Sequence, residues 1–317
     1  MPSADQDVIL SLSGIRRSFG NLEAVRGLSL EVFRGEVFGF LGPNGAGKTT
    51  TIRMISGLLR PDGGEIRLAG TLLQENPRAC RQRIGLCPQE LVIWETLTCL
   101  EQLVFVGTQY DLEYRLARSR SLELLEILGL TQQQDRLAET LSGGMKRRLN
   151  LALALVHDPE LLILDEPQAG LDPQSRVLVR EYIQSLAKEK TVLLTTHEMD
   201  EADRLATRIG IIDHGELLVL DAPNNLKEAH AGGEILELTL ENSGGGIEAF
   251  LASLADDIQS LDSLPGTLRL TGKSLHDRVP EIFHSLREAD IQVRDVTLRK
   301  PTLEDVFVSL TGRGLRE

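Results

Sequence analysis

Short apolar runs alternate with helical patterns along the first two thirds of the chain. Glu36–Leu41, Leu161–Leu164 and Val192–Leu194 have the length and composition of buried strands. Thr50–Leu59 has apolar residues at helical spacing after the first of these runs, and a helix is expected around Ser175–Lys188 between the other two. This alternation predicts a parallel sheet that is covered on both faces.

Antiparallel strands and a helical insertion are predicted around this sheet. Val8–Val32 consists of strand-like pieces separated by turns, and the turn Pro61–Gly64 leads into a further strand at Glu65–Leu68. Residues 98–129 follow a helical period instead. We therefore expect a helical insertion between the first helix and the strand at Leu161.

The pattern loosens between Asp221 and Gly233, which predicts a first domain over residues 1–230 and a second over residues 231–317. The second part predicts a small α+β domain, with a helix at its end that is capped by Thr302 and has acidic residues in its first turn. Its elements follow the order βαββαβ, a split-βαβ arrangement. The sequence gives residues for five of these six elements: a strand at 235–240, a helix at 247–257, a strand at 268–270 after the turn Pro265-Gly266, a helix at 278–288 and a strand at 291–293.

Charge and composition narrow the class of ligand and the cellular location. The 317 residues carry a formal net charge of −13, which argues against nucleic acid as a partner. Cys80, Cys87 and Cys99 match neither a redox pair nor a zinc ligand set, so reduced cytosolic thiols are expected. The N-terminus is acidic rather than signal-like, and the apolar stretches are too short to span a membrane.

Residues 42–50 fit the phosphate-binding pattern G-x-x-x-x-G-K-[ST], between a predicted strand and a predicted helix. Gly42, Gly45 and Gly47 are expected in left-handed conformations that bring backbone N–H groups against phosphate oxygens. Lys48 adds a positive charge near the phosphates, and the Thr49 hydroxyl is placed to hold Mg²⁺. A glycine-rich turn with no ligand is the alternative. The predicted nucleotide-binding residues in this run are Gly42, Pro43, Asn44, Gly45, Ala46, Gly47, Lys48, Thr49 and Thr50.

The phosphate loop and the pattern of strands and helices together predict an α/β P-loop NTPase fold. It has a parallel sheet core, an antiparallel β subdomain, a helical insertion and a small α+β C-terminal domain. Asp165 ends the strand at 161–164 and so is expected beside the phosphate loop as a second metal ligand. Glu166 follows it as the general base or water-orienting group for hydrolysis. Solvated surface carboxylates are the alternative for both.

A second anion-binding helix start is predicted at Ser142-Gly143-Gly144, where a hydroxyl and free N–H groups converge. Taken alone, this run is equally consistent with a simple N-cap.

Six motifs occur in the order seen in ABC transporter ATPase subunits, and the resemblance covers residues 8–222. They are the phosphate loop, Gln89 after a strand, Leu141–Gly144, Asp165-Glu166, Gly170–Asp172 and a strand that ends at His197. Met145 and Gln168 depart from the family pattern, which often has Gln at the first position and commonly Ser or Thr at the second.

The resemblance implies a role for each motif residue. Phe19 would stack on adenine, Gln89 would reach Mg²⁺ and report on the membrane partner, and His197 would contact the γ-phosphate. Ser142, Gly143 and Gly144 would bind the γ-phosphate that a second subunit holds, and Asp172 would cross the interface of this homodimer. A core aromatic, a surface amide and a strand-end histidine are the alternatives for Phe19, Gln89 and His197.

The segment Lys300–Phe307 with Leu310–Gly312 resembles the end of ATPase subunits from exporters of drugs, lipids and oligosaccharides, whose permeases are separate chains. The resemblance implies an ATPase that binds ATP and Mg²⁺ at the cytoplasmic face of the membrane, peripheral to an integral membrane permease. Residues 89–98 are expected to receive the permease, with Trp94 either as a contact there or equally as a core residue. A soluble ABC ATPase that acts on a ribosome or DNA, and a module that only senses ATP, are the alternatives.

Overall fold

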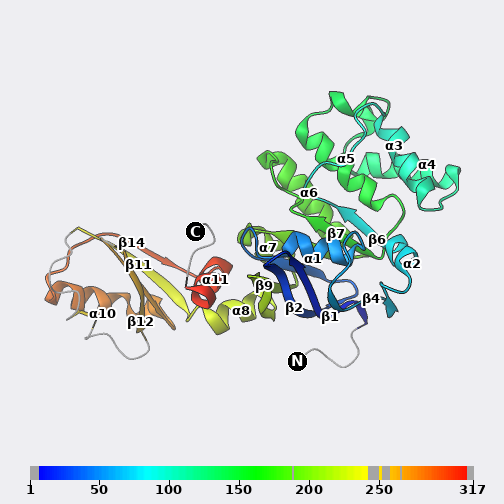
Figure 1. The fold of residues 1–317 in the computed structure, drawn as a ribbon. Helices are drawn as coiled ribbons and strands as arrows, with labels where there is room; N and C mark the ends of the chain where they lie inside the picture. Colours follow the sequence, from blue (N-terminus) through cyan, green and yellow to red (C-terminus); the bar gives the residue numbers. More distant parts are fainter. Residues whose placement is uncertain (1–6, 188, 242–249, 252–257, 265, 313–317) are drawn as a thin grey trace. The chain divides into compact units, whose positions relative to one another are not determined.

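The computed structural model describes residues 7–187, 189–241, 250–251, 258–264 and 266–312. These form two compact units, Met1–Ala222 and Pro223–Glu317. The sequence places the boundary after residue 230, whereas the units divide after Ala222. Helix α8 (Pro223–His230) therefore belongs to the second unit, where it packs against α11 (Leu303–Thr311) (Figure 1).

The core of the first unit is a six-stranded sheet in the order β10-β9-β3-β8-β7-β6. From β9 to β6 all neighbouring strands are parallel, and β10 pairs antiparallel with β9. The expected parallel sheet is thus confirmed. Its strands are β3 (Val37–Leu41), β6 (Ile84–Cys87), β7 (Leu161–Asp165), β8 (Thr191–Thr196), β9 (Arg208–Asp213) and β10 (Glu216–Asp221).

Both faces of this sheet are buried, as the continuous apolar runs predict. In β7, Leu162 and Leu164 join one hydrophobic cluster while Leu161 and Ile163 join another on the opposite face. The first cluster includes residues of the helical part of the unit, and the second includes the antiparallel sheet. The helices of the core are α1 (Lys48–Ile55), α6 (Pro173–Leu186) and α7 (Met199–Leu205).

Helix α1 ends earlier than its apolar spacing predicts. The sequence suggests a helix to Leu59, but the chain leaves the helix after Ile55 because Gly57 takes a left-handed conformation with φ 70°. The Leu58 N–H then donates to the Arg53 carbonyl and the Gly57 N–H to the Met54 carbonyl, which closes the helix end.

An antiparallel sheet in the order β2-β1-β4-β5 and a helical insertion complete the first unit. Both were predicted. The sheet consists of β1 (Val8–Phe19), β2 (Leu22–Phe33), β4 (Gly63–Leu68) and β5 (Thr71–Leu72), followed by the short helix α2 (Pro77–Gln82). The insertion holds α3 (Cys99–Gln109), α4 (Tyr114–Ile127), two 3₁₀ turns at Thr131–Gln133 and Ala138–Thr140, and α5 (Gly143–Leu155).

The second unit contains an antiparallel sheet in the order β12-β13-β11-β14. Numbered within the unit, this is second, third, first and fourth, the order of a split-βαβ fold. Leu236 and Leu238 of β11 pack on Ile282 and Leu286 of α10. The elements are β11 (Glu234–Leu240), β12 (Ile258–Leu264), β13 (Thr267–Gly272), α10 (Leu275–Glu288) and β14 (Val293–Arg299).

In this unit, one expected strand differs from the structure and one expected helix lies mostly outside the described residues. The strand expected at 291–293 is wrong in its bounds, because β14 pairs with β11 as far as Arg299 and begins only at Val293. Most of the helix expected at 247–257 lies outside the described residues, and Phe250 and Leu251 are helical. The capped tail helix is confirmed, since the Thr302 hydroxyl accepts from the Asp305 N–H and the Asp305 carboxylate accepts from the Thr302 N–H.

We expect Gly85→Ala in β6 to lower the free energy of unfolding by about 1–3 kcal/mol, since overpacking a filled core costs this much. An added Cβ would lie 2.1 Å from the Ala154 carbonyl oxygen of α5 and 2.8 Å from Pro159. Gly63→Ala is the matched control, because its Cβ would meet nothing within 4 Å. Chemical unfolding checks both variants, and equal effects would contradict the assigned packing.

Candidate functional site

Most of the predicted site residues follow four adjacent strands of the parallel sheet. The phosphate loop follows β3, His197 follows β8, Asp165 ends β7 with Glu166 behind it, and Gln89 comes after β6. In the sheet these strands lie side by side in the order β3-β8-β7-β6. Because the carboxyl ends of parallel strands meet at one edge, residues far apart in the sequence are brought to a common site there.

The phosphate loop uses its glycines in two different ways. Gly45 has φ 82° and Gly47 has φ 103°, as predicted for left-handed residues. The expected left-handed conformation is wrong for Gly42, because its φ is not positive. There the constraint is space, because a Cβ would lie 2.3 Å from the Ile212 carbonyl oxygen of β9. Gly47 precedes α1 and offers no side chain to cap it, so the first N–H groups of the helix remain for a ligand.

Lys48 begins α1 and is buried. Its ammonium group donates to the carbonyl oxygens of Gly42 at 2.5 Å and Pro43 at 3.0 Å, so it lies across the loop. Burial lowers the pKa of Lys48, and the nearby charges of Glu166 and Asp165 partly restore it. An anionic ligand in the loop would favour the charged form further.

A cleft of about 250 Å³ lies over this loop. Leu22 and Ala24 of β2 also line it, although no sequence pattern pointed to them. The predicted residues that line the cleft are Phe19, Pro43, Asn44, Gly45, Gly47, Lys48, Thr49, Thr50, Gln89 and Glu166. Gly42 and Ala46 lie buried beneath it.

Two oxygen groups that suit a divalent cation lie close together beside the cleft, because Thr49 lines both the cleft and a neighbouring groove that Asp165 lines. The Thr49 Oγ1 lies 3.4 Å from Asp165 Oδ2, while Asp165 Oδ1 accepts a hydrogen bond of 2.5 Å from the Thr195 hydroxyl. Neighbouring ligands of an octahedral Mg²⁺ are about 3 Å apart, since each bond is about 2.1 Å long. The pair therefore fits Mg²⁺ with little movement, and Gln89 lines the neighbouring groove together with both residues.

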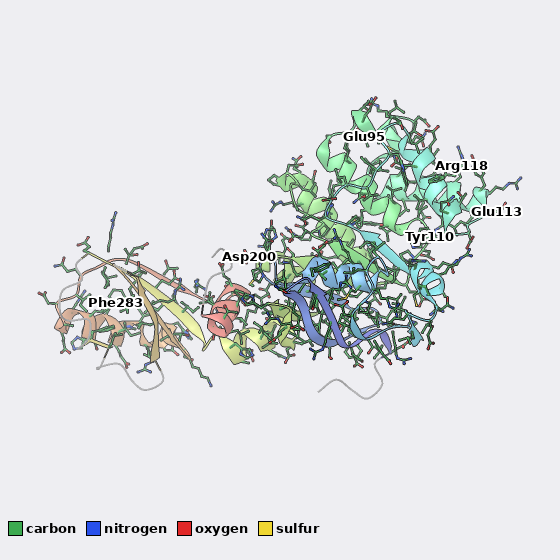
Figure 2. The ribbon with its side chains drawn as sticks, viewed as in Figure 1. Glu95, Tyr110, Glu113, Arg118, Asp200 and Phe283 are labelled. Atoms are coloured by element: carbon green, nitrogen blue, oxygen red, sulfur yellow. The ribbon has the colours of Figure 1, made fainter. Side chains whose placement is uncertain are left out.

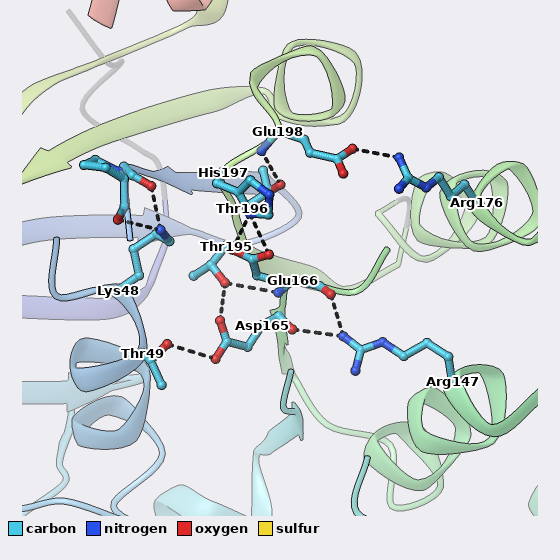
Figure 3. A network of polar contacts seen from close by, with 12 residues as sticks. Lys48, Thr49, Arg147, Asp165, Glu166, Arg176, Thr195, Thr196, His197 and Glu198 are labelled. Carbon is cyan, nitrogen blue, oxygen red and sulfur yellow. Dashed lines mark hydrogen bonds and ion pairs between the residues drawn. The ribbon is translucent and has the colours of Figure 1, made fainter. Parts of the chain in front are cut away.

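Each polar group of Glu166 is held by a different part of the fold (Figure 3). Its N–H donates to the Thr195 carbonyl, and its carbonyl accepts from Arg147. Its carboxylate lies 2.7 Å from the His197 Nδ1. These contacts hold a residue with φ 50°, a left-handed conformation that costs a non-glycine residue about 1 kcal/mol or more.

The sequence analysis did not predict Thr195 and Arg147 as site residues. Thr195 had a usable signal, because it lies near the end of β8 beside the strand of Asp165. Arg147 had none, since nothing local distinguishes a buried arginine from the exposed ones on a helix. The side chain is only 4% exposed and lies between the β6 and β7 loops.

Ser142 and Gly143 are exposed at the start of α5, and none of the residues 142–144 lines the cleft of the phosphate loop. The Ser142 hydroxyl accepts from the Met145 N–H at 3.4 Å, so the N-cap reading holds locally. Asp172 caps α6 in the same way, and hydrogen bonds from the Ser175 hydroxyl and N–H lower its pKa. A Cβ on Gly144 would lie 2.7 Å from the Ser175 hydroxyl, so the two helix starts adjoin.

The sequence of the chain is similar to known families and proteins. The sequence model described as "ABC transporter" matches residues 25–169. The linearmycin resistance ATP-binding protein LnrL of Bacillus subtilis (strain 168) is 40% identical over 316 residues, which cover 98% of this chain and 100% of that protein. This chain belongs to the ABC transporter family.

Further relatives and a solved structure agree with this assignment. The Nod factor export ATP-binding protein I of Ralstonia nicotianae is 37% identical to this ABC protein. The aligned region covers 100% of this chain and 98% of that protein. A solved ATP-binding subunit of an ABC transporter superposes with a TM-score of 0.65 at 28% identity, over 69% of this chain and 92% of that one. The predicted P-loop NTPase fold is confirmed, and the protein is an ABC-type ATPase.

Among the helices within the described ranges, none is both long enough and apolar enough to cross a membrane.

We expect Thr195→Val to lower ATPase turnover at least about tenfold, because the groups that orient a metal ligand typically matter by 10- to 100-fold. Valine has the same shape but removes the hydroxyl that binds both the Asp165 carboxylate and the Glu166 N–H. Thr196→Val is the control, since that hydroxyl accepts from the Glu198 N–H instead. Steady-state assays with a folding check compare them, and equal turnover in both variants would argue against the assigned role.

Proposed function

We propose that this ABC ATPase is the energy-coupling subunit of an exporter, in which ATP closes two copies of the chain around two nucleotides. The observation that carries the proposal is the separation of the two phosphate-binding helix starts within one chain. The phosphate loop lines the cleft, whereas Ser142 and Gly143 face solvent away from it. A twofold dimer places the second helix start over the partner's nucleotide.

Export is supported by the relatives rather than by the site. Two of them are named for linearmycin resistance and for Nod factor export. Their similarity extends through the second unit, because the aligned regions cover 98% and 100% of this chain. We infer that this protein also supports export, and that it acts at the cytoplasmic face of the membrane, where ATP is available.

The residues of the cleft fit Mg-ATP. We assign Thr49, Asp165 and Gln89 as the oxygen ligands of Mg²⁺, which would neutralise phosphate charge during transfer. Lys48 and the N–H groups of residues 45–50 bind the phosphates, and Phe19 at the end of β1 offers a ring for adenine. The ring is half exposed and has the Arg17 guanidinium 5.0 Å from its centroid.

Glu166 and His197 are placed to act on water. The Glu166 carboxylate reaches the cleft and is buried, so it can accept a proton from a water that attacks the γ-phosphate. His197 fixes this carboxylate and can itself contact the γ-phosphate. Hydrolysis then removes the one group that both copies bind, which removes the differential binding that favours the closed dimer.

A groove beside the site is suited to receive the permease. We call residues 88–98, the loop between β6 and α3, the docking loop. It lines a groove of about 470 Å³ together with Tyr110, Asp165 and residues of α1 and α5, so the groove includes the three proposed Mg²⁺ ligands (Figure 2 labels Tyr110 and Glu95). Trp94 is 41% exposed and meets Phe105 of α3 edge to face at 5.6 Å. Leu91 and Val92 are exposed beside them, and such apolar patches mark interaction sites.

Glu166→Gln is expected to reduce turnover by about 10²- to 10⁴-fold, the usual contribution of a general base, while ATP still binds. The variant should accumulate as an ATP-bound dimer, because closure no longer ends in hydrolysis. Light scattering after size exclusion with and without Mg-ATP measures the dimer. Glu198→Gln is the control, since Glu198 pairs with Arg176 and does not line the cleft. A monomeric Glu166→Gln protein that binds ATP would contradict the proposal.

Changing Trp94 and Phe105 to serine should reduce recovery of a polytopic membrane protein with the tagged chain at least about tenfold, because aromatic residues dominate interface energies. Detergent extraction, affinity purification and mass spectrometry measure the recovery, and the ATPase rate of the isolated chain should stay within about twofold. Tyr114→Ser serves as control, since the exposed Tyr114 of α4 does not line the groove as Trp94 does, and its ring does not pack on Trp94 as that of Phe105 does. Undiminished recovery from the double variant would rule out this docking surface.

A further inference from the structure

The first turns of α5 bind the docking loop through polar side chains. The Lys146 ammonium pairs with the Glu95 carboxylate at 3.0 Å. The buried Asn150 accepts from the Val92 N–H at 3.1 Å and donates to the Pro88 carbonyl at 3.4 Å. The loop that we assign to the permease is thus attached to the helix that begins at Ser142.

Arg147 lies between these two residues and binds more than the docking loop. Its Nη1 donates to the carbonyl oxygens of Pro88 and Gln89, both at 2.8 Å. Its Nε and Nη2 donate to three carbonyls at the end of β7 and in the loop that follows it (Figure 3 shows two of them). These are Pro167 at 3.0 Å, Asp165 at 3.0 Å and Glu166 at 2.6 Å.

A guanidinium group has five N–H donors, which here all bind backbone carbonyls. Because the group is planar and rigid, the two sets of carbonyls keep a fixed relation to each other. Because the side chain is also buried, losing either set would leave two or three N–H donors of a desolvated cation without partners. A displacement of the docking loop therefore has to move the backbone of Glu166 or break these bonds.

We propose that Arg147 is a positioning residue that couples the docking loop to Glu166, so that the occupant of the groove controls the alignment of the hydrolytic carboxylate. The proposal rests on the proposed role of Glu166. Arg147 does not line the nucleotide cleft, so it acts on turnover and not on ATP affinity. Its substitution therefore has a kinetic signature that differs from general loss of structure.

The lysine variant of Arg147 tests this with the full-length chain. Lysine keeps the charge but presents its three donors on one nitrogen, which cannot bind both loops in the same geometry. We expect Arg147→Lys to lower kcat about 10- to 100-fold, the effect of an ångström-scale misplacement, with KM for ATP within about twofold. Arg147→Met, which leaves no buried charge, is made in parallel in case the lysine variant does not fold.

Arg148→Lys is the matched control. Arg148 is the next residue of the same helix, but its Nη1 donates to the Leu128 and Gly129 carbonyls in the helical insertion. Both kcat and KM of this variant should stay within about twofold of wild type. Equal losses in the Arg147 and Arg148 variants, an unchanged kcat in a folded Arg147 variant, or failure of both Arg147 variants to fold would overturn the proposal.

Trp94 supplies a second readout, since it is the single tryptophan of the chain and lies in the docking loop. Addition of a non-hydrolysable ATP analogue should shift its emission in wild type and in Arg148→Lys, but not in a folded Arg147 variant that binds the analogue equally well. No shift in wild type, or the same shift in the Arg147 variant, would also overturn the coupling. Failure of the role of Glu166 is distinguishable, because it shows as undiminished turnover of Glu166→Gln.

Discussion

The site depends on the parallel pairing of β3, β8, β7 and β6 in that spatial order. These strands are separated by long stretches of sequence, yet each ends at the same edge of the sheet. The phosphate loop, Asp165 and Gln89 therefore converge although their positions in the chain are far apart. The pairing also requires close approach of other elements, as at Gly85, where α5 leaves no room for a Cβ.

Strain and polar contacts are balanced at Glu166. Its left-handed backbone costs about 1–3 kcal/mol, and net contributions of about 0.5–1.5 kcal/mol for each hydrogen bond are enough to offset it. The contacts come from β8, from α5 and from the residue after β8. Since these elements also border the phosphate loop, the docking loop and the Ser142 helix start, the position of Glu166 can respond to each of them. This gives the proposed role of Glu166 in hydrolysis a physical connection to the proposed docking and dimer surfaces.

The sequence predicted structural features correctly where they depend on local residue patterns. The phosphate loop, the capped helix at Thr302 and the split-βαβ order are set by neighbouring residues and by short periodic runs. It was a poor guide to element ends and to close contacts. Gly57 stops α1 before the apolar spacing does, and Gly42 is needed because Ile212 of β9 approaches it, not because of its backbone angle. Neither effect is visible in the spacing of apolar residues.

By itself the sequence determined which residues we predict to bind phosphate and metal, because these groups act through short contiguous motifs whose chemistry depends on residue type. Only the tertiary structure decided which groups hold them in place. Thr195 binds Asp165 across a strand pair, and Arg147 joins two loops that are separated by most of the helical insertion. Such contacts arise from strand order and helix packing, which bring distant residues within hydrogen-bond distance, and no local pattern records them.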